Sequence, residues 1–367
     1  MRPKATLAVD LLRKRLEHAD HRLRKLPGER RLAEEMGLSR NTIRWALEQL
    51  VQEGQLSRKR NGRIAVTRTQ KAQSKTRTIG FLAPSVFSND HKQWYDGVAA
   101  VVDGLGAKLR PLTYAHWGDA VIHQALEGMD GLFFIPQRNQ LPKWLVDKIR
   151  EAPCRTVVLD MDESAAQLPS VVLFPPISIG KLLNHLLKLG HRKIDCLNTQ
   201  TENSVIAERV EAWRTFLKEK GLSGKLRTVS KGRPIEVAHA VIRKALRGGG
   251  STSPAQFCTT GPAAIGAMRA FHEAGLEIGR DVSVCAVNDE GLAPYLLKTL
   301  TCLASPPRSE YLRRAAKWML KGGAWSGHLL LQPKEAPLYI GESTGPALKN
   351  SRVRSHVRRS KRKETSK

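Results

Sequence analysis

Residues 26–54 read Leu-Pro-Gly-Glu-Arg-Arg-Leu-Ala-Glu-Glu-Met-Gly-Leu-Ser-Arg-Asn-Thr-Ile-Arg-Trp-Ala-Leu-Glu-Gln-Leu-Val-Gln-Glu-Gly, a pattern that predicts two short helices joined by a tight turn. The first helix is expected to open after Pro27, with Glu29 in its first turn. Gly37 and Leu38 form the turn, and Ser39 is a good N-cap for the second helix.

The second helix has two faces of different character. Apolar side chains recur along it at helical spacing and predict a buried stripe made of Ile43, Leu47, Leu50 and Val51. The opposite face presents Arg40, Asn41 and Arg44 from the first turns. Arginine and asparagine on such a face suit the major groove, where their side chains reach base edges. The two helices are therefore predicted to form a helix-turn-helix.

A basic hairpin follows the second helix. Residues 55–60 and 63–67 are predicted to be two strands around Asn61-Gly62, a strong short hairpin signal. Four basic side chains crowd its tip, namely Arg58, Lys59, Arg60 and Arg63. This composition favours a wing that lies along phosphates or in the minor groove.

The whole segment resembles the GntR family of winged-helix regulators. The matching pieces are Leu-Pro-x-Glu-Arg at 26–30, Gly-Leu-Ser-Arg-x-Thr-Ile-Arg at 37–44, and a glycine-containing wing. At 62–66 the wing lacks the second glycine and the aromatic residue that are usual in the family. The resemblance implies DNA contacts by Arg30, Arg40 and Arg44, supported by Ser39, Asn41, Thr42 and Gly62, with Arg58, Lys59, Arg60, Asn61 and Arg63 completing the predicted DNA-binding set.

The charge distribution also indicates a polyanionic partner. The chain has 61 Lys and Arg against 34 Asp and Glu, a net charge of +27. Residues 1–77 carry 20 basic and 8 acidic side chains, and residues 348–367 carry 9 and 1. No run of about 18 apolar residues predicts a membrane span, and no signal-peptide core opens the chain. We expect a cytoplasmic, nucleoid-associated protein without a membrane partner, and a disordered basic tail at 347–367.

The five cysteines are widely spaced and four of them sit in or beside apolar runs, so buried reduced thiols are expected. The chain has no Gly-x-Ser-x-Gly elbow, P-loop or His-Glu-x-x-His motif. We therefore predict no catalytic residues, no metal, no cofactor and no enzymatic activity.

Beyond a polar linker at 70–77, short apolar runs alternate with helical patterns. Unbroken apolar strands between helices predict parallel sheets covered on both faces, whose ligands bind beyond the carboxyl ends of the strands. The predicted strands are 78–82, 131–135, 156–159, 194–197, 255–258 and 282–287. The predicted helices include 92–106, 119–127, 178–189, 204–220, 235–246 and 262–274.

Residues 78–346 resemble the effector domain of the LacI family, a periplasmic-binding-protein-like fold. The resemblance rests on pieces such as Ile-Gly-Phe-Leu at 79–82, Leu-Gly-His-Arg-Lys-Ile at 189–194 and Asp-Val-Ser-Val at 281–284. It implies an α/β fold with two lobes, three crossovers and a cleft that closes on a small molecule. The predicted domains are thus 1–69, a winged helix-turn-helix; 70–77, a linker; 78–346, the two-lobed domain; and 347–367, the tail.

The resemblance places Arg209 where the family has an arginine that binds sugar hydroxyls, and a guanidinium offers a rigid fork of donors for that purpose. Asn288-Asp289 stands at a usual Asp-Asp pair, Thr260-Gly261 at a usual Asn-Asp, and Phe174 at a usual Asp. Alternatives are a surface ion pair for Arg209, a turn cap for Asn288 and a core position for Trp94. The predicted effector-binding set is Ser85, Trp94, Arg209, Thr260, Asn288 and Asp289.

Together these patterns predict a sequence-specific transcriptional regulator, a repressor that binds a double-stranded DNA operator as a homodimer. Its effector is expected to be a small, carbohydrate-like molecule. The alternative is an architectural or weakly specific DNA-binding protein whose large domain only dimerises. The high charge and the altered polar cleft set favour that alternative, whereas the well-formed recognition helix opposes it.

Overall fold

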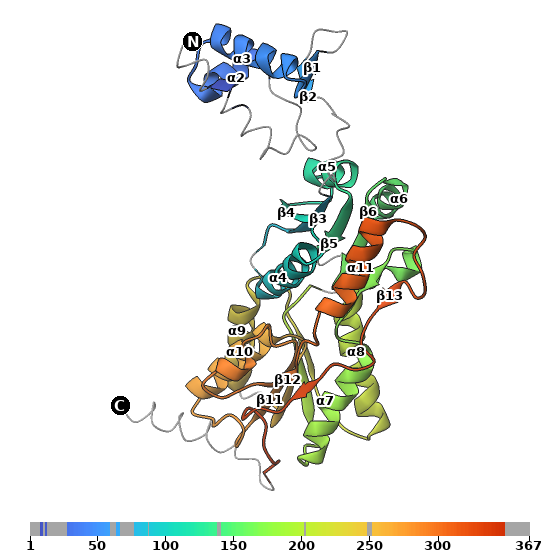
Figure 1. Cartoon of the computed structure of the whole chain (residues 1–367). Coiled ribbons are helices and arrows are strands. Elements are labelled where there is room, and N and C mark those ends of the chain that lie inside the picture. The colour runs from blue at the N-terminus through green and yellow to red at the C-terminus, as the bar shows by residue number, and fades with distance from the viewer. Residues whose placement is uncertain are drawn as a thin grey trace, which may run out of the picture.

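The computed structural model describes residues 8–9, 12, 28–58, 64–66, 77–86, 88–137, 141–201, 203–247 and 252–348. The elements form three groups, an N-terminal group and two lobes between which the chain passes more than once (Figure 1). The first group contains α2 (Glu29–Met36), α3 (Arg40–Gln52), β1 (Leu56–Arg58) and β2 (Ile64–Val66).

The predicted helix-turn-helix is confirmed in its local detail. The Ser39 hydroxyl accepts a hydrogen bond from the Thr42 N–H at 3.1 Å and so caps α3. Gly37 ends α2 at φ 62°, a left-handed conformation that glycine adopts without strain. The apolar stripe of α3 packs on α2 and on the N-terminal segment, in a core of Ala8, Val9, Leu12, Leu32, Ala33, Ile43, Ala46, Leu47, Leu50 and Leu56.

The two wing strands pair antiparallel over the residues that the structure describes. Arg58 lies opposite Ile64. An uninterrupted ladder on a two-residue turn at Asn61-Gly62 would instead pair Arg58 with Ala65, so the register differs from the predicted one by one residue. Lys59, Arg60, Asn61, Gly62 and Arg63 lie outside the described residues, as do residues 70–76 of the predicted linker and 349–367 of the predicted tail.

The second group forms the first lobe around a six-stranded parallel sheet, with strand order β13-β7-β6-β5-β3-β4. Its strands are β3 (Thr78–Pro84), β4 (Lys108–Tyr114), β5 (Gly131–Phe134), β6 (Arg155–Leu159), β7 (Ser170–Val171) and β13 (Leu330–Leu331). Its helices are α4 (Asn89–Asp103), α5 (Ala120–Gly128), α6 (Lys143–Glu151), η1 (Ser164–Ala166) and α11 (Ser309–Lys321).

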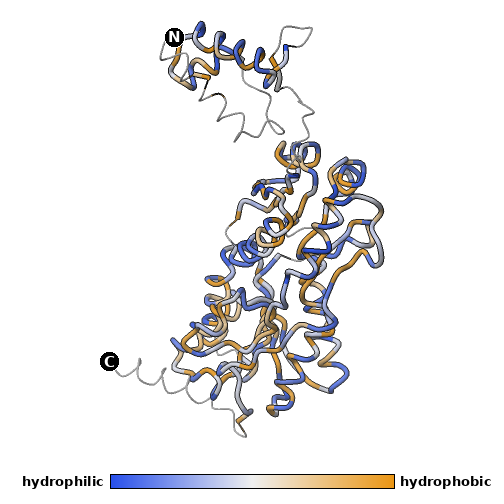
Figure 2. Tube along the Cα trace, in the orientation of Figure 1, coloured by the Kyte–Doolittle hydropathy of each residue, from blue (hydrophilic) through white to orange (hydrophobic). Residues whose placement is uncertain are grey.

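Alternation along β3 places the two faces of this sheet in different cores. Ile79 and Phe81 pack with α4 and α11, whereas Leu82 packs with α5 and α6. Successive side chains of a strand point to opposite faces, so an unbroken apolar run requires helices on both. The helices in Figure 2 alternate between apolar and polar segments, as expected for helices with one buried side.

The second lobe repeats this plan with strand order β14-β12-β11-β10-β8-β9. Its strands are β8 (Ile194–Asn198), β9 (Leu226–Thr228), β10 (Ala255–Cys258), β11 (Ser283–Val287), β12 (Thr301–Leu303) and β14 (Leu338–Tyr339). Its helices are α7 (Pro176–Lys188), α8 (Ser204–Glu219), α9 (Pro234–Arg247), α10 (Gly261–Glu273) and η2 (Ala293–Tyr295). The edge strand β14 runs antiparallel to β12, which is a departure from the wholly parallel sheet that the sequence predicts.

Three segments cross between the lobes, as expected. They connect β7 to α7, β12 to α11, and β13 to β14. All five cysteines are buried free thiols, as the sequence predicts. Within the described residues, no helix is long and apolar enough to span a membrane.

Candidate effector cleft and DNA-binding surface

A cavity of about 940 Å³ lies between the two lobes. Residues that follow the carboxyl ends of strands in both sheets line it, which is where parallel sheets bind ligands. Its volume falls within the range of roughly 300–1,000 Å³ that is usual for small-molecule sites.

The cavity wall concentrates backbone strain. Asp160, Asn288 and Glu290 have φ angles of 62°, 58° and 51°, and all three line the cavity. In the described part of the chain, Gln167 is the other non-glycine residue with positive φ. Such conformations cost free energy and persist where the surrounding structure enforces them, often at functional sites.

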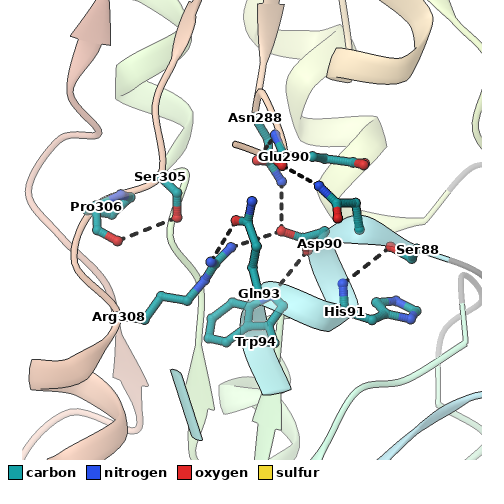
Figure 3. Close-up of polar contacts among 11 residues, drawn as sticks. Ser88, Asp90, His91, Gln93, Trp94, Asn288, Glu290, Ser305, Pro306 and Arg308 are labelled. Atoms are coloured by element: carbon teal, nitrogen blue, oxygen red, sulfur yellow. Dashed lines mark hydrogen bonds and ion pairs between the residues drawn. The ribbon is translucent and has the colours of Figure 1, made fainter. Parts of the chain in front are cut away.

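Asp90 is the hub of a polar network that joins the lobes (Figure 3). Its Oδ1 accepts hydrogen bonds from Arg308 Nη2 at 2.9 Å and from Asn288 Nδ2 at 3.0 Å. Its Oδ2 accepts one from the Trp94 indole N–H at 3.1 Å. Asp90 comes from the first lobe and Asn288 from the second, so this carboxylate bridges the cleft. A second bridge joins Asn89 Nδ2 to the Glu290 carbonyl at 2.5 Å.

Arg308 anchors the network from the segment that links β12 to α11. Its Nη1 donates to Gln93 Oε1 at 2.8 Å, and its guanidinium lies 4.9 Å from the centre of the Trp94 ring. The ion pair with Asp90 is shielded from water, with side-chain exposures of 11% and 9%. Desolvation therefore strengthens the attraction and also makes either partner costly to leave alone.

Arg209 comes from α8 of the second lobe, lines the cavity and is 6% exposed. Its Nη1 donates to the Thr259 carbonyl at 2.8 Å, and its guanidinium lies 5.8 Å from the Phe174 ring centre. Its Nε has no hydrogen-bond partner among the described residues. Burial lowers the pKa of Arg209, although Asp160 and Asp90 oppose the effect. The alternative of a surface ion pair is wrong, because the side chain is buried.

Asp160 directly follows β6 and faces the same cavity. Burial and the nearby Asp90 charge raise its pKa to about 7, against the opposing influence of Arg209 and Arg308. A carboxylic acid with such a pKa changes protonation near neutral pH.

The cavity includes four of the six residues predicted to bind an effector, namely Ser85, Arg209, Thr260 and Asn288. The Thr260 hydroxyl is unpartnered among the described residues. Trp94 does not line the cavity. It is fully buried in the core, because its place on the inner face of α4 directs the indole N–H to Asp90. Asp289 does not line it either, since its Oδ2 accepts from the Ala293 N–H at 3.4 Å.

Sequence reasoning missed Asp90, Asp160, Glu290 and Arg308. For Asp160 a signal was present, because it ends an apolar run that the sequence predicts to be a strand. No local spacing points to Asp90 and Arg308, which are 218 positions apart.

On the helix-turn-helix, the recognition face of α3 is open to solvent. Arg40 and Asn41 are exposed. Arg44 directs its Nε and Nη2 to Glu29 Oε2 at 3.1 and 3.0 Å and remains half exposed. Arg30 pairs with Glu34 at 3.3 Å, and Arg58 pairs with Glu48 at 3.7 Å. Exposed pairs of this kind contribute about 0–1 kcal/mol, so phosphates or bases can replace the carboxylates.

Two family descriptions match separate parts of this chain. Residues 5–66 match the bacterial regulatory proteins of the gntR family, and residues 183–324 match the periplasmic binding protein-like domain. The chain joins a GntR-type helix-turn-helix domain to a periplasmic-binding-protein-like domain. The GntR-type match includes α2, α3 and the wing strands, and the second match runs from within α7 to just beyond α11.

The similar curated proteins are helix-turn-helix regulators. The transcriptional repressor PurR of Vibrio vulnificus is 25% identical over 250 residues, covering 66% of this chain and 74% of that protein. PurR of Photobacterium profundum is 24% identical, with an alignment that covers 49% of this chain and half of that protein. The regulator AscG of Escherichia coli is 27% identical over 144 residues, covering 38% of this chain and 43% of that protein.

Solved structures confirm the two-lobed fold of the periplasmic-binding-protein-like domain. The Lac repressor dimer bound to operator and an anti-inducer superposes with a TM-score of 0.64 at 21% identity, covering 75% of this chain and 96% of that one. A LacI-family regulator from Enterococcus faecium with bound ribose gives 0.63 at 17% identity, covering 74% and 100%.

Proposed function

We propose that this protein is a transcriptional repressor that binds a specific DNA operator as a homodimer and releases it in response to a small polyhydroxylated molecule. The observation that carries the proposal is the recognition face of α3, with Arg40, Asn41 and Arg44 accessible on a helix fixed by its buried stripe. The relatives, which are named as repressors and regulators, support the regulatory role.

In this proposal the predicted division of the chain assigns one task to each part. Residues 1–69 read DNA, 70–77 link, 78–346 sense the effector and dimerise, and 347–367 add basic charge. The DNA contacts are the twelve residues predicted above, with Arg40 and Arg44 reading base edges. The cleft binds its ligand without transforming it, and the protein acts in the cytoplasm, where the DNA is.

We propose that effector binding in the cleft and operator binding by the helix-turn-helix domains are coupled allosterically. An effector that binds the DNA-incompetent state more tightly lowers the affinity of the protein for its operator. By reciprocity, the operator lowers the affinity of the protein for the effector by the same factor. The hydrogen bonds from Asn288 to Asp90 and from Asn89 to the Glu290 carbonyl join the two lobes. Opening of the cleft would break them, and closure would keep them.

A second candidate is an architectural protein that coats DNA with little preference, and the net charge of +27 favours it. Selection of genomic fragments by the purified protein at about 0.15 M salt, followed by sequencing, separates the two. We expect one inverted-repeat motif near promoters, since a two-fold dimer reads two half-sites. Broad enrichment without a motif would support the architectural protein instead.

The dimer is expected to use an apolar segment of the second lobe. Leu292, Tyr295 and Leu297 lie close together in sequence and are 38%, 84% and 104% exposed. Exposed apolar clusters mark interaction sites. The double substitution Tyr295→Asp and Leu297→Asp should yield monomers in analytical ultracentrifugation at micromolar concentration. Ile177→Asp, at another exposed apolar position, is the matched control and should leave the dimer intact. An unchanged dimer in the double variant places the interface elsewhere.

A further inference from the structure

The cavity carries more negative than positive charge at its polar centre. Four carboxyl groups, Asp90, Asp160, Glu208 and Asp289, interact with the two guanidinium groups of Arg209 and Arg308, and Glu290 adds repulsion on Asp160. At the rim, Arg233 and Glu236 pair with one another at 2.5 Å and cancel. The remaining titratable side chains that line the cavity are His91 and Tyr114. With these carboxyl groups ionised, negative charge exceeds positive charge around the two guanidinium groups.

The distribution of partners locates this excess at Asp160. Asp90 already accepts three hydrogen bonds, one of them from Arg308. By contrast, no described residue donates a hydrogen bond to the Asp160 carboxylate, although its backbone N–H is bonded to the Val171 carbonyl at 2.9 Å. The left-handed backbone at Asp160 places this carboxyl group at the cavity wall.

A second, independent feature points to a ligand. Arg209 is more than nine-tenths buried and lines the same cavity, yet its Nε has no partner among the described residues. A buried guanidinium N–H that lacks an acceptor costs free energy unless a ligand or water supplies one. Hydroxyl oxygens are suitable acceptors for its fork of donors.

We infer that the cleft selects a polyhydroxylated molecule carrying a protonated amine, with the ammonium group paired to Asp160 and the hydroxyl groups bound by Arg209. The inference rests on the proposed function and narrows its effector class. An ammonium group offsets the excess negative charge and supplies the ionised Asp160 with the donors that it lacks. A neutral sugar forms no ion pair with Asp160, whether that carboxyl group is protonated or ionised.

The pairing has a consequence for pH. With the pKa of Asp160 at about 7 in the empty cleft, about half of the molecules hold it protonated at pH 7. An ammonium ligand binds the ionised form, so binding lowers the pKa of Asp160 and releases about half a proton at pH 7. The ionised fraction rises from about a tenth at pH 6 to about nine-tenths at pH 8, so affinity should rise about tenfold across that range.

Titration calorimetry of the full chain with matched pairs tests this inference. The pairs are glucamine against sorbitol, glucosamine against glucose, and galactosamine against galactose, and glucamine serves for the pH series because its amine stays protonated. We expect at least one amine to bind ten times or more tightly than its neutral partner. Calorimetry in buffers of different ionisation enthalpy should show the proton release.

Asp160→Asn should abolish both the preference for amines and the pH dependence. Asparagine tolerates the left-handed backbone, and this change removes a charge that burial disfavours, so the variant should fold. Asp96→Asn, in an exposed pair with Lys92 away from the cavity lining, is the matched control and should change neither property. Tighter or equal binding of the neutral partners, no binding of any amine, or an unchanged preference in Asp160→Asn would overturn the inference. Recovery of an operator motif by fragment selection tests the proposed function separately, so failure of the amine preference can be distinguished from failure of operator recognition.

Discussion

Arg44→Ala is expected to remove most of the preference for operator over random DNA. Arg44 projects from the first turns of α3, and a bidentate contact to a base gives about 1–3 kcal/mol of discrimination. Two half-sites double this, so the ratio of operator to random affinity should fall by a factor between about 30 and about 20,000. In the unbound protein its partner is Glu29 in an exposed pair, which is replaced at little cost.

Fluorescence anisotropy with the selected operator and a scrambled duplex at one salt concentration measures that ratio. Arg31→Ala is the matched control, since Arg31 is an exposed α2 residue paired with Glu35 and is not among the predicted contacts. Lys59→Ala is expected to weaken binding to both duplexes alike, as a phosphate contact does. An equal loss on both duplexes for Arg44→Ala would show that Arg44 binds phosphate and reads no base.

Asp90→Ala is expected to destabilise the two-lobed domain by about 3 kcal/mol. The change removes the acceptor of three hydrogen bonds and leaves Arg308 buried with Gln93 as its remaining side-chain hydrogen-bond partner. Breaking a buried ion pair by deleting one partner costs about 3–5 kcal/mol. Relief of the repulsion between Asp90 and Asp160 offsets part of this cost, which sets the estimate at the lower end.

Urea unfolding followed by tryptophan fluorescence gives the free energy of unfolding. Asp96→Ala is the matched control, because Asp96 lies on the same helix in an exposed pair with Lys92 and should cost less than about 1 kcal/mol. Similar midpoints for the two variants would mean that the Asp90 network contributes little to stability, and would leave the bond to Asn288 as an incidental contact.

The features that the sequence predicts correctly are those with local signals. Ser39 caps α3 because a serine hydroxyl can reach an N–H three residues later, and that relation is visible in the order of residues. The strand from Ile79 to Leu82 is visible because it is apolar on both faces. Ser85 follows that strand and lines the cavity, and its contact with an effector stays a prediction.

The cleft network depends on distance through the fold, so the sequence predicts only part of it. Asn288 is 198 positions from Asp90, and no period or spacing joins them. The sequence predicts Trp94 as an effector contact, with a core position as the alternative, and the alternative is confirmed because Trp94, one helical turn after Asp90, is buried in the core. Asp289 follows a residue that lines the cavity, but its Oδ2 accepts a hydrogen bond from the Ala293 N–H at the start of η2.

The coupling between cleft and operator tests the central claim most directly. Operator affinity should be measured by anisotropy with and without a saturating cleft ligand, identified by the rise in melting temperature that it causes. The affinity of that ligand should then be measured with and without operator. We predict that the ligand weakens operator binding at least fivefold, and that operator weakens the ligand by the same factor. A ligand that fills the cleft and leaves operator affinity unchanged would contradict the account.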